Sequence, residues 1–428
     1  CHEDHCSRPC AGGCAGDLVC QSATLSRQGS SLTHDFCLRP PPIEVVELGS
    51  VDTPASGAQP VTFDLASDVK SFVLFAEDQD DLLVGIHRLE GPDGKVWIAD
   101  NAEAVLAKPS SYIGTGTVLV PGSDAAEAVV TPGAYKAWVQ TYDPQTAASL
   151  TPVDGDAERV GLVFWRWGHR GGLLDLNLHL APGTGITAAD AAESAFVGGL
   201  LGRLDGLYRD LAGLALAEVR FFDLPDTADA LTDGDAARAV VKQYAQAGPH
   251  GLSVNVFLVD TFELTAGLAG GAPGVPGLIG RPGSGIVIDK QGDDAKKTGT
   301  LLAHELGHFL GLFHPSELRS EGSALYSTGA GDIIADTPEC PVDTPHRNCP
   351  DYPNLMVPRV PAEVTLTPGQ AEIVRGVPWH YQMIYPEVCG PEIEAVDLTA
   401  HGYGSDATAG ASAFAGSCGG DQQGERVH

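Results

Sequence analysis

Three histidines and one glutamate stand close together in the stretch HELGHFLGLFH. His304 and His308 are four residues apart, so on a helix their side chains project from one face and can bind the same metal ion. Glu305 lies slightly off that face, where it can take a proton from a water molecule. Gly311 tolerates the positive φ with which a backbone leaves a helix sharply. His314 can then return as a third ligand.

Three neutral imidazoles predict a catalytic zinc site, because they leave a fourth position open for water. The alternative is an amphipathic helix that carries histidines on its surface. An apolar face for such a helix is present, formed by Leu301, Leu302, Leu306, Phe309, Leu310 and Phe313. Packing of that face does not explain three histidines and a glutamate on the remaining positions, so zinc is the favoured interpretation.

A methionine follows the histidines at a position that is typical of one class of zinc enzymes. The chain has two methionines, and Met356 is in the sequence Asn-Leu-Met-Val. This segment resembles the Met-turn of metzincin metallopeptidases, in which a methionine forms a hydrophobic floor beneath the zinc ligands.

The second half of the chain is more specifically similar to the pappalysin family of metzincins. The similarity includes GDIIADTP from Gly331, the pair Cys340 and Cys349, and Thr-Pro-Gly-Gln from Thr367. It implies an α+β metzincin-like catalytic domain over residues 172–390, with a mixed twisted sheet, an active-site helix and an irregular C-terminal subdomain.

The same resemblance implies a second cation and a substrate pocket. Calcium is expected at Asp332, Asp336 and Thr337, since carboxylate and carbonyl oxygens are suitable hard ligands. The alternative is an ordinary surface turn. Arg359 follows the Met-turn, in a segment that lines the pocket for the residue after the cleaved bond, and would favour an acidic side chain unless it points to solvent.

One position departs from the family. Pappalysins have a tyrosine two residues after the Met-turn methionine that can stabilise the transition state, and here that residue is Pro358. Either another group does this work or the site is slower. Nearby tyrosines in the sequence are Tyr352, Tyr381 and Tyr385.

The remaining sequence predicts three further parts. Residues 1–40 are a small disulfide-rich module. Residues 43–168 contain short strand patterns separated by turns, as in a β-sandwich, and residues 391–428 are a Gly/Ala/Ser-rich tail. The sequence allows the sandwich to bind substrate, attach to a surface or support the folded state.

Two local patterns open the expected catalytic domain. Leucines alternate with polar residues from Leu174 to Leu180, which predicts a half-buried strand. Within it, His179 is a polar strand residue rather than a metal ligand. Thr187 and Asp190 resemble a capping box, which predicts that the next helix begins there.

The ten cysteines divide into six within the first 37 residues and four in the second half. Even numbers predict three disulfides and two disulfides, which form outside the cytoplasm. A zinc knuckle that includes His2 and His5 is the alternative for the first group. The first residue, Cys1, fits either the acylated cysteine of a bacterial lipoprotein or removal of a signal peptide, and both place the protein outside the cytoplasm or on the cell surface.

The net charge of −31 argues against nucleic-acid binding, since phosphates would be repelled. No apolar run reaches the length of a membrane-spanning helix, so membrane association is expected only through a lipid on Cys1. The sequence thus predicts a secreted zinc endopeptidase that acts on proteins or peptides, with Zn²⁺ and Ca²⁺ as cofactors. The alternative is an extracellular adhesin or binding protein with a vestigial zinc site.

Overall fold

The computed structural model describes residues 19–27, 30–38, 46–67, 69–78, 82–144, 151–165, 172–248, 253–276, 279–317, 331–341, 343–377 and 379. For the first two ranges only the backbone is described. Among these residues, no helix has the length and apolar character needed to cross a membrane.

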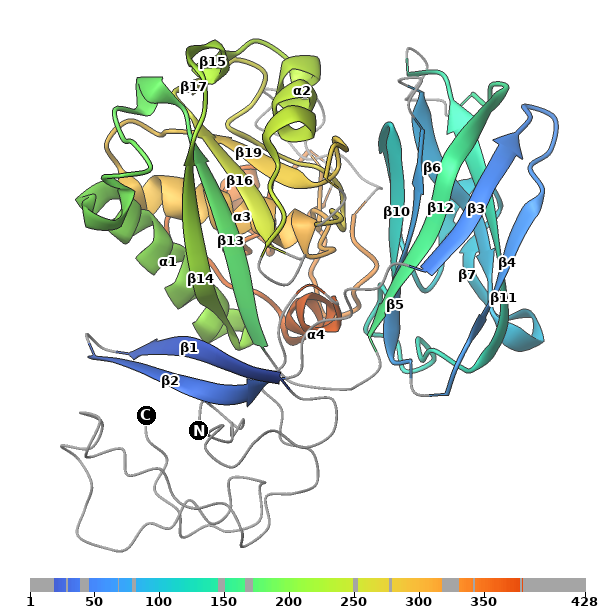
Figure 1. Cartoon of the computed structure of the whole chain (residues 1–428). Helices are drawn as coiled ribbons and strands as arrows, with labels where there is room; N and C mark the ends of the chain where they lie inside the picture. Colours follow the sequence, from blue (N-terminus) through green and yellow to red (C-terminus); the bar gives the residue numbers. More distant parts are fainter. Residues whose placement is uncertain are drawn as a thin grey trace, which may run out of the picture.

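Strands between residues 46 and 165 form one antiparallel sheet that curls around its own core (Figure 1). Their bounds are β3 Val46–Thr53, β4 Pro60–Leu65, β5 Ser71–Glu77, β6 Leu83–Glu90, β7 Val96–Ala99, β8 Glu103–Ala104, β9 Pro109–Ile113, β10 Thr115–Val120, β11 Gly133–Tyr142 and β12 Gly155–Trp165. The main path is β3-β12-β5-β10-β9-β6-β11-β4, and β7 pairs with β6 and β8.

The expected all-β region is present, but the prediction of two separate sheets is corrected. Strand β9 pairs with β10 along most of its length and with β6 only at Leu83 and Val84. This short strand therefore joins two halves that would otherwise be separate layers. Aromatic residues fill the space between the halves, with Phe72 edge-on to Tyr135.

A second, smaller sheet follows in the chain. Its order is β14-β13-β16-β19-β18, parallel except for β18. The bounds are β13 Gly172–Leu180, β14 Leu214–Asp223, β16 Val254–Val259, β18 Gly267–Ala269 and β19 Gly285–Asp289, with a short pair β15 Ala230–Leu231 and β17 Thr261–Phe262. The helices are α1 Ala195–Ala212, α2 Gly234–Tyr244, α3 Ala295–Phe309 and α4 Pro368–Gly376.

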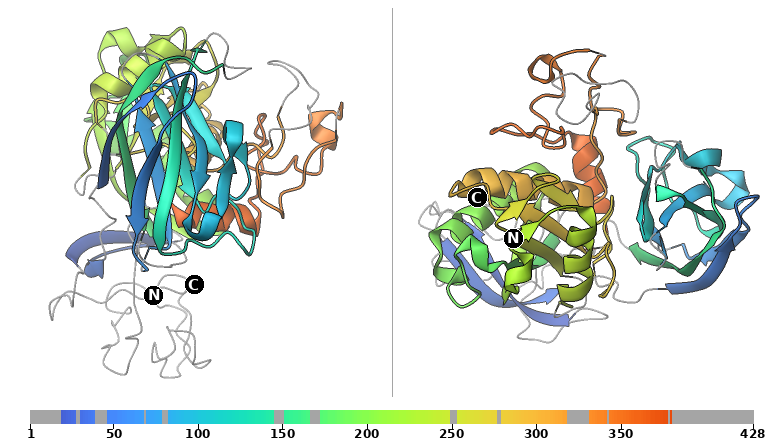
Figure 2. Two further views of the ribbon diagram at one scale, coloured as in Figure 1. Left: turned by 90° about the vertical axis from the view of Figure 1, so that its right-hand side faces the viewer. Right: turned by 90° about the horizontal axis from the view of Figure 1, so that it is seen from above.

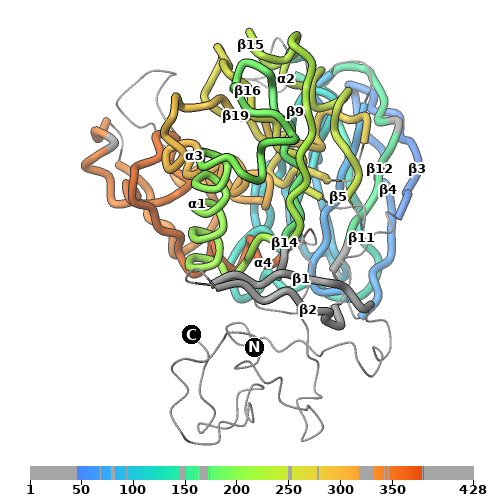
Figure 3. The backbone as a smooth tube through the Cα atoms, turned by 60° about the vertical axis from the view of Figure 1, so that its left-hand side comes forward, coloured from blue at the N-terminus to red at the C-terminus, as the bar shows by residue number. Residues whose placement is uncertain are grey.

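Helices cover both faces of this mixed sheet. Helices α1 and α3 lie next to one another on one face (Figure 3), and their leucines share a core with β13 and β16. Helix α2 packs on the opposite face, where Ala237 and Val241 meet Phe257. This α/β arrangement is the observed fold, and the more specific metzincin layout stays a prediction.

The prediction of a half-buried strand at Leu174–Leu180 is wrong, because β13 is a central strand with both faces covered. Its polar residues Asp175, Asn177 and His179 are as buried as its leucines. They face α2, where Asn177 donates to Gln246 O at 2.7 Å. Hydrogen bonding within the protein replaces the water that the alternating pattern suggested.

The predicted helix start at Thr187 is also wrong. Thr187 does donate to Asp190 Oδ2 at 2.6 Å, but this bond closes a turn. Helix α1 begins at Ala195, after Ser194 accepts from Val197 N. The same sequence pattern occurs where a side chain caps a turn and where it caps a helix. For this reason the start of α1 was predicted too early in the chain.

The curled sheet contacts α4, the end of α3 and the loop after β18. Helix α4 lies between the two sheets in the view of Figure 1 and the second view of Figure 2. Val73, Phe75, Leu119 and Val163 belong to the same buried cluster as the residues of α1 and α3. We call these four side chains the docking face. An interface with a continuous apolar core fixes the two parts relative to each other.

Near the N-terminus, β1 Val19–Arg27 and β2 Ser30–Leu38 form a hairpin. Cys20 and Cys37 are backbone partners in its register. The other four cysteines of the predicted module, the alternative zinc knuckle, Cys389, Cys418 and the tail 391–428 lie outside the described residues.

Candidate metal centre

Helix α3 carries two of the three histidines. It begins after Asp294, whose carboxylate accepts from Lys297 N at 2.9 Å, and the chain turns away at Gly311 with φ of +94°. A Cβ at Gly311 would lie 2.9 Å from a methyl carbon of Leu119, and L-residues rarely adopt this φ. The helix end predicted at Gly311 is therefore present, and the docking face covers it.

The three histidines meet through their Nε2 atoms. His314 Nε2 lies 3.1 Å from His308 Nε2 and 3.3 Å from His304 Nε2. Two nitrogens bound to one tetrahedral zinc at its usual distance are about 3.3 Å apart. The spacing of these atoms therefore fits a single zinc ion.

Each opposite ring nitrogen has an oxygen partner. His304 Nδ1 lies 2.7 Å from Leu355 O, His308 Nδ1 lies 2.8 Å from Leu312 O, and His314 Nδ1 lies 2.9 Å from Glu317 Oε1. In neutral rings the hydrogen is therefore on Nδ1, and the three Nε2 lone pairs face one another. Three acceptors this close repel unless a cation lies between them, so the cluster fits a metal ion.

Burial keeps the rings of His304 and His308 neutral. Burial, with a smaller effect from the charge of His314, lowers the pKa of His304 to about 3. Burial likewise lowers the pKa of His308 well below its ordinary value, and the charges of His314 and His304 add to this. Neutral imidazole is the form that binds zinc.

Glu305 lies beneath β18 and is 6% exposed. A Cβ at Gly267 would lie 2.5 Å from its Oε1, so only glycine leaves room for this carboxylate. Burial raises the pKa of Glu305 to about 8, although a hydrogen bond from the Ala269 backbone opposes the shift. A carboxyl with a pKa near neutrality can both accept and return a proton.

The segment around Met356 supports the cluster from the other side. A Cβ at Gly307 would lie 2.4 Å from Met356 Sδ, so the thioether packs directly against the backbone of α3. Asn354 Oδ1 accepts from Met356 N at 2.8 Å. The neighbouring carbonyl of Leu355 is the partner of His304. The segment thus both packs under the histidines and orients one of them.

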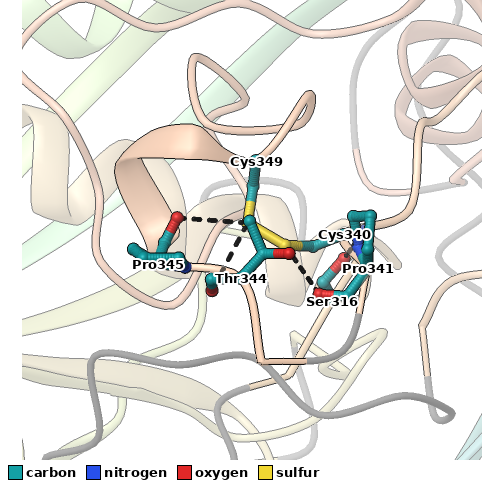
Figure 4. Close-up of a disulfide and its surroundings, with 6 residues drawn as sticks. All are labelled: Ser316, Cys340, Pro341, Thr344, Pro345 and Cys349. Atoms are coloured by element: carbon teal, nitrogen blue, oxygen red, sulfur yellow. Dashed lines mark hydrogen bonds between the residues drawn. A yellow bond between two sulfur atoms is a disulfide. The ribbon is translucent and has the colours of Figure 1, made fainter.

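The loop after His314 is held by a disulfide (Figure 4). Cys340 and Cys349 are bonded, with Cα atoms 5.1 Å apart. The backbone N–H of Cys340 donates to Ser316 Oγ at 2.8 Å, two residues after the third histidine. This cross-link restricts the position of the chain near His314, and it is the pairing within the second half that the even cysteine count allowed.

The predicted calcium residues do not form a carboxylate cluster. Asp332 accepts from Ile334 N at 3.2 Å, and burial raises its pKa to about 7. Asp336 accepts from Gly369 N at 2.9 Å. Thr337 Oγ1 lies 3.5 Å from Thr367 Oγ1. Both carboxylates thus have backbone partners, and calcium stays a prediction.

Arg359 is exposed and Pro358 is half-buried, so the specificity role of Arg359 also stays a prediction. Tyr352 is half-buried, whereas Tyr381 and Tyr385 lie outside the described residues. Sequence reasoning missed the groups that orient the histidines, namely Leu312 O, Leu355 O and Glu317. The position of Glu317, three residues after His314, could have suggested this contact. The backbone carbonyls could not be identified from the sequence, because every residue has one.

No protein-family model matches the chain, and no curated protein matches it. Among solved structures, the chain is similar to mirolysin in complex with compound 9, at 16% identity and a TM-score of 0.34, over 48% of this chain and 91% of that one. The chain is also similar to mature mirolysin of Tannerella forsythia in complex with a cleaved peptide, at 16% identity and a TM-score of 0.33, over 49% of this chain and 91% of that one.

Metalloproteinase-II from Bacteroides fragilis is similar at 12% identity and a TM-score of 0.29, over 51% of this chain and 61% of that one. Metallopeptidases are thus among the similar structures. At these scores the likeness carries no weight for function, which has to be argued from the geometry of the site.

Proposed function

We propose that this chain is a zinc-dependent endopeptidase. The observation that carries the proposal is the convergence of three Nε2 lone pairs, with His314 Nε2 3.1 Å from that of His308 and 3.3 Å from that of His304. A structural histidine cluster would use those nitrogens in hydrogen bonds. The acidic side chain next to the cluster, Glu305, adds the base that hydrolysis requires.

The chain's own residues have separate tasks in this proposal. The three histidines hold zinc, which when bound supplies Lewis acidity to activate water and polarise a peptide carbonyl. Glu305 takes a proton from the attacking water on its carboxylate and returns it to the nitrogen of the leaving amine. Proton transfer by a placed carboxylate contributes about 10²–10⁴-fold.

A peptide substrate fits the edge of the smaller sheet. Strand β18 is the last strand of that sheet in the part of the chain that is described, and Glu305 lies directly under its Gly267. An extended peptide can add to a sheet edge through backbone hydrogen bonds. Its carbonyl carbon would then pass close to Glu305, which favours peptides over smaller substrates.

Two observations support the narrower assignment to a pappalysin-like metzincin, and a third supports a location outside the cytoplasm. Met356 packs against Gly307 beneath the histidines. Thr367 and Gln370 form a capping box that begins α4. The Cys340–Cys349 disulfide is typical of proteins outside the cytoplasm, which supports a secreted or surface location. In the same proposal, Ca²⁺ binds near Asp332.

The competing function is an extracellular binding protein whose zinc site is vestigial. It accounts for the large curled sheet and for Pro358. It gives no role to Glu305, because a structural zinc site needs no carboxyl with a pKa near neutrality beside its open position. We therefore favour the enzyme.

The test is digestion of a proteome-derived peptide library, read by mass spectrometry, with wild type and Glu305→Ala compared at equal zinc content. Cleavage by the wild type alone is expected. Zinc-loaded wild type that cuts nothing would favour the binding protein, and a Glu305→Ala variant of full activity would remove Glu305 from the mechanism.

A further inference from the structure

Strand β9 of the curled sheet lies against the part of the chain that carries the histidine cluster. Side chains alternate along a strand, so Lys108, Ser110 and Tyr112 point to the same side. Ser110 Oγ accepts from Ala272 N at 3.2 Å. Lys108 Nζ donates to Gly331 O at 2.7 Å and lies 4.6 Å from the ring centre of Phe313. The first two residues of this row therefore contact the half of the chain that carries the metal centre.

Neighbouring contacts fix β9 in this place. Thr117 on the adjacent strand β10 donates to Pro273 O at 2.8 Å. Glu77 on β5 lies 3.5 Å from Arg281. Together with the apolar docking face, these bonds hold the hairpin of β9 and β10 against the loop between β18 and β19. Tyr112 is thus placed by a rigid interface rather than by a loose loop.

Tyr112 lies close to the same strand that covers the general base. It lines a cavity of about 110 Å³ together with Leu268, Ala269 and Gly270 at the end of β18. Ala269 is the residue whose backbone hydrogen bonds to the Glu305 carboxylate. The cavity is mostly apolar and is also lined by residues of α2, so it lies on the α2 side of β18, whereas Glu305 lies on the other side of this strand. Tyr112 is thus beside the edge of β18, along which the peptide is proposed to bind.

The charges around Tyr112 agree with this position. Burial, together with smaller effects of the negative charges of Glu305 and Glu317, raises the pKa of Tyr112 to about 12. Glu317 is the partner of His314. The phenol therefore lies within the electrostatic reach of groups on two sides of the histidine cluster. It remains protonated at neutral pH, so it is a hydrogen-bond donor and not a base.

We propose that Tyr112 is a substrate-contacting residue of the active site, contributed by the curled sheet, whose hydroxyl donates a hydrogen bond to a carbonyl oxygen of the peptide bound along β18. This inference rests on the proposed peptidase function. It gives the curled sheet a role in the site itself, beyond packing. No tyrosine after Met356 is required for such a donor.

The test compares Tyr112→Phe with wild type. The substitution keeps the ring that fills the cavity and removes only the hydroxyl. We expect kcat/KM on a cleaved library peptide to fall by about tenfold or more, as when one hydrogen bond to a substrate is lost. Zinc content, measured by mass spectrometry, and melting temperature should stay unchanged.

A second measurement does not depend on turnover. In a Glu305→Gln background, the same peptide is titrated calorimetrically with and without Tyr112→Phe. We expect Kd to rise by about tenfold when the hydroxyl is absent. This arm separates contact with the substrate from any effect on the proton transfer by Glu305.

Tyr142→Phe is the matched control. Tyr142 lies on β11 of the same sheet, is 2% exposed, and has its pKa raised to about 12 by burial alone. Its hydroxyl pairs with His87 Nδ1 at 3.3 Å, away from the metal centre. It should lose no activity and no affinity for the peptide.

Two outcomes would overturn the inference while leaving the peptidase intact. Equal kcat/KM and Kd for wild type and Tyr112→Phe would make Tyr112 a packing residue only. Higher activity of Tyr112→Phe would mean that the curled sheet obstructs the site. A zinc-loaded wild type that cuts no peptide would instead contradict the proposed function.

Discussion

Two groups of buried polar side chains lie on opposite faces of the smaller sheet, and each contains a histidine whose pKa is lowered by burial. On the α3 face, the pKa of His304 is about 3, and on the α2 face, that of His179 is about 4. In the second group, His179 Nε2 lies 2.9 Å from Asn255 Oδ1, and its ring stacks on Phe222 and Phe257.

The difference between the two groups is where the lone pairs point. The Nε2 of His179 donates its hydrogen to an amide oxygen, so the ring is satisfied by the protein alone. On the other face, Nδ1 of each ring takes the oxygen partner, and three Nε2 acceptors remain facing one another. Burial and a lowered pKa are common to both, so they do not identify a metal site. What indicates a metal site is a set of acceptor nitrogens that face one another with no hydrogen-bond donor between them.

The largest expected effect comes from removing one histidine from each group. We expect His304→Ala to lose zinc on dialysis and to lose peptide hydrolysis, because two ligands hold the ion far less tightly than three. His179→Gln should keep one zinc per chain and its activity. Zinc is measured by mass spectrometry and hydrolysis on a cleaved peptide. Zinc retained by His304→Ala, or lost by His179→Gln, would remove the distinction between the two faces.

An intermediate effect is expected from pH. The pKa of His179 falls from 6.5 to about 4 on folding, so the unfolded chain binds a proton that the folded chain does not. The contribution of His179 to stability is therefore complete above pH 6.5 and is lost as the pH falls towards 4. The change amounts to about 3 kcal/mol.

Denaturant unfolding of metal-free protein at pH 7 and pH 4 measures this change. The comparison is between wild type and His179→Gln, in which the shared contribution of the other histidines cancels. The wild type should lose about 3 kcal/mol more than the variant. An equal loss in both proteins would mean that His179 is protonated in the folded state.

The smallest effect is expected at Asp332. A measurement there tests whether an oxygen ligand that already has protein partners also gains little from a metal ion. The Asp332 carboxylate already has partners, as His179 does, so a bound calcium would add little. We expect calcium removal from zinc-saturated protein to lower the melting temperature by about 2–4 °C, equivalent to about 1 kcal/mol. Asp332→Asn should show no such shift. An unchanged melting temperature in the wild type would remove calcium from the proposal.

Much of the fold could be predicted from local patterns. The short strands expected between residues 43 and 168 and the helix that carries His304 are where the sequence indicated. Their signals are local, because alternation and helical spacing depend on neighbouring residues. Strand β9 was not predicted. It consists of five residues that begin with a proline, and its pairing with β6 joins residues about 30 positions apart in the sequence, as in Leu83 with Ile113.

The candidate site divides in the same way. The spacing of His304, Glu305 and His308 on one helix predicts that they share a face whatever surrounds them. His314 joins them because the chain turns at Gly311, which belongs to the same stretch. A prediction from so few residues needs only the geometry of a helix and a turn.

By itself, then, the sequence predicted the chemistry of the candidate metal centre, because its proposed donors are contained in eleven consecutive residues. Only the tertiary structure decided which groups orient those donors and where Tyr112 lies. Leu355 O and Tyr112 are 51 and 192 residues from His304 along the chain. Contacts over such separations come from the packing of β9 and of the Met356 segment against α3, and no periodicity in the sequence records them.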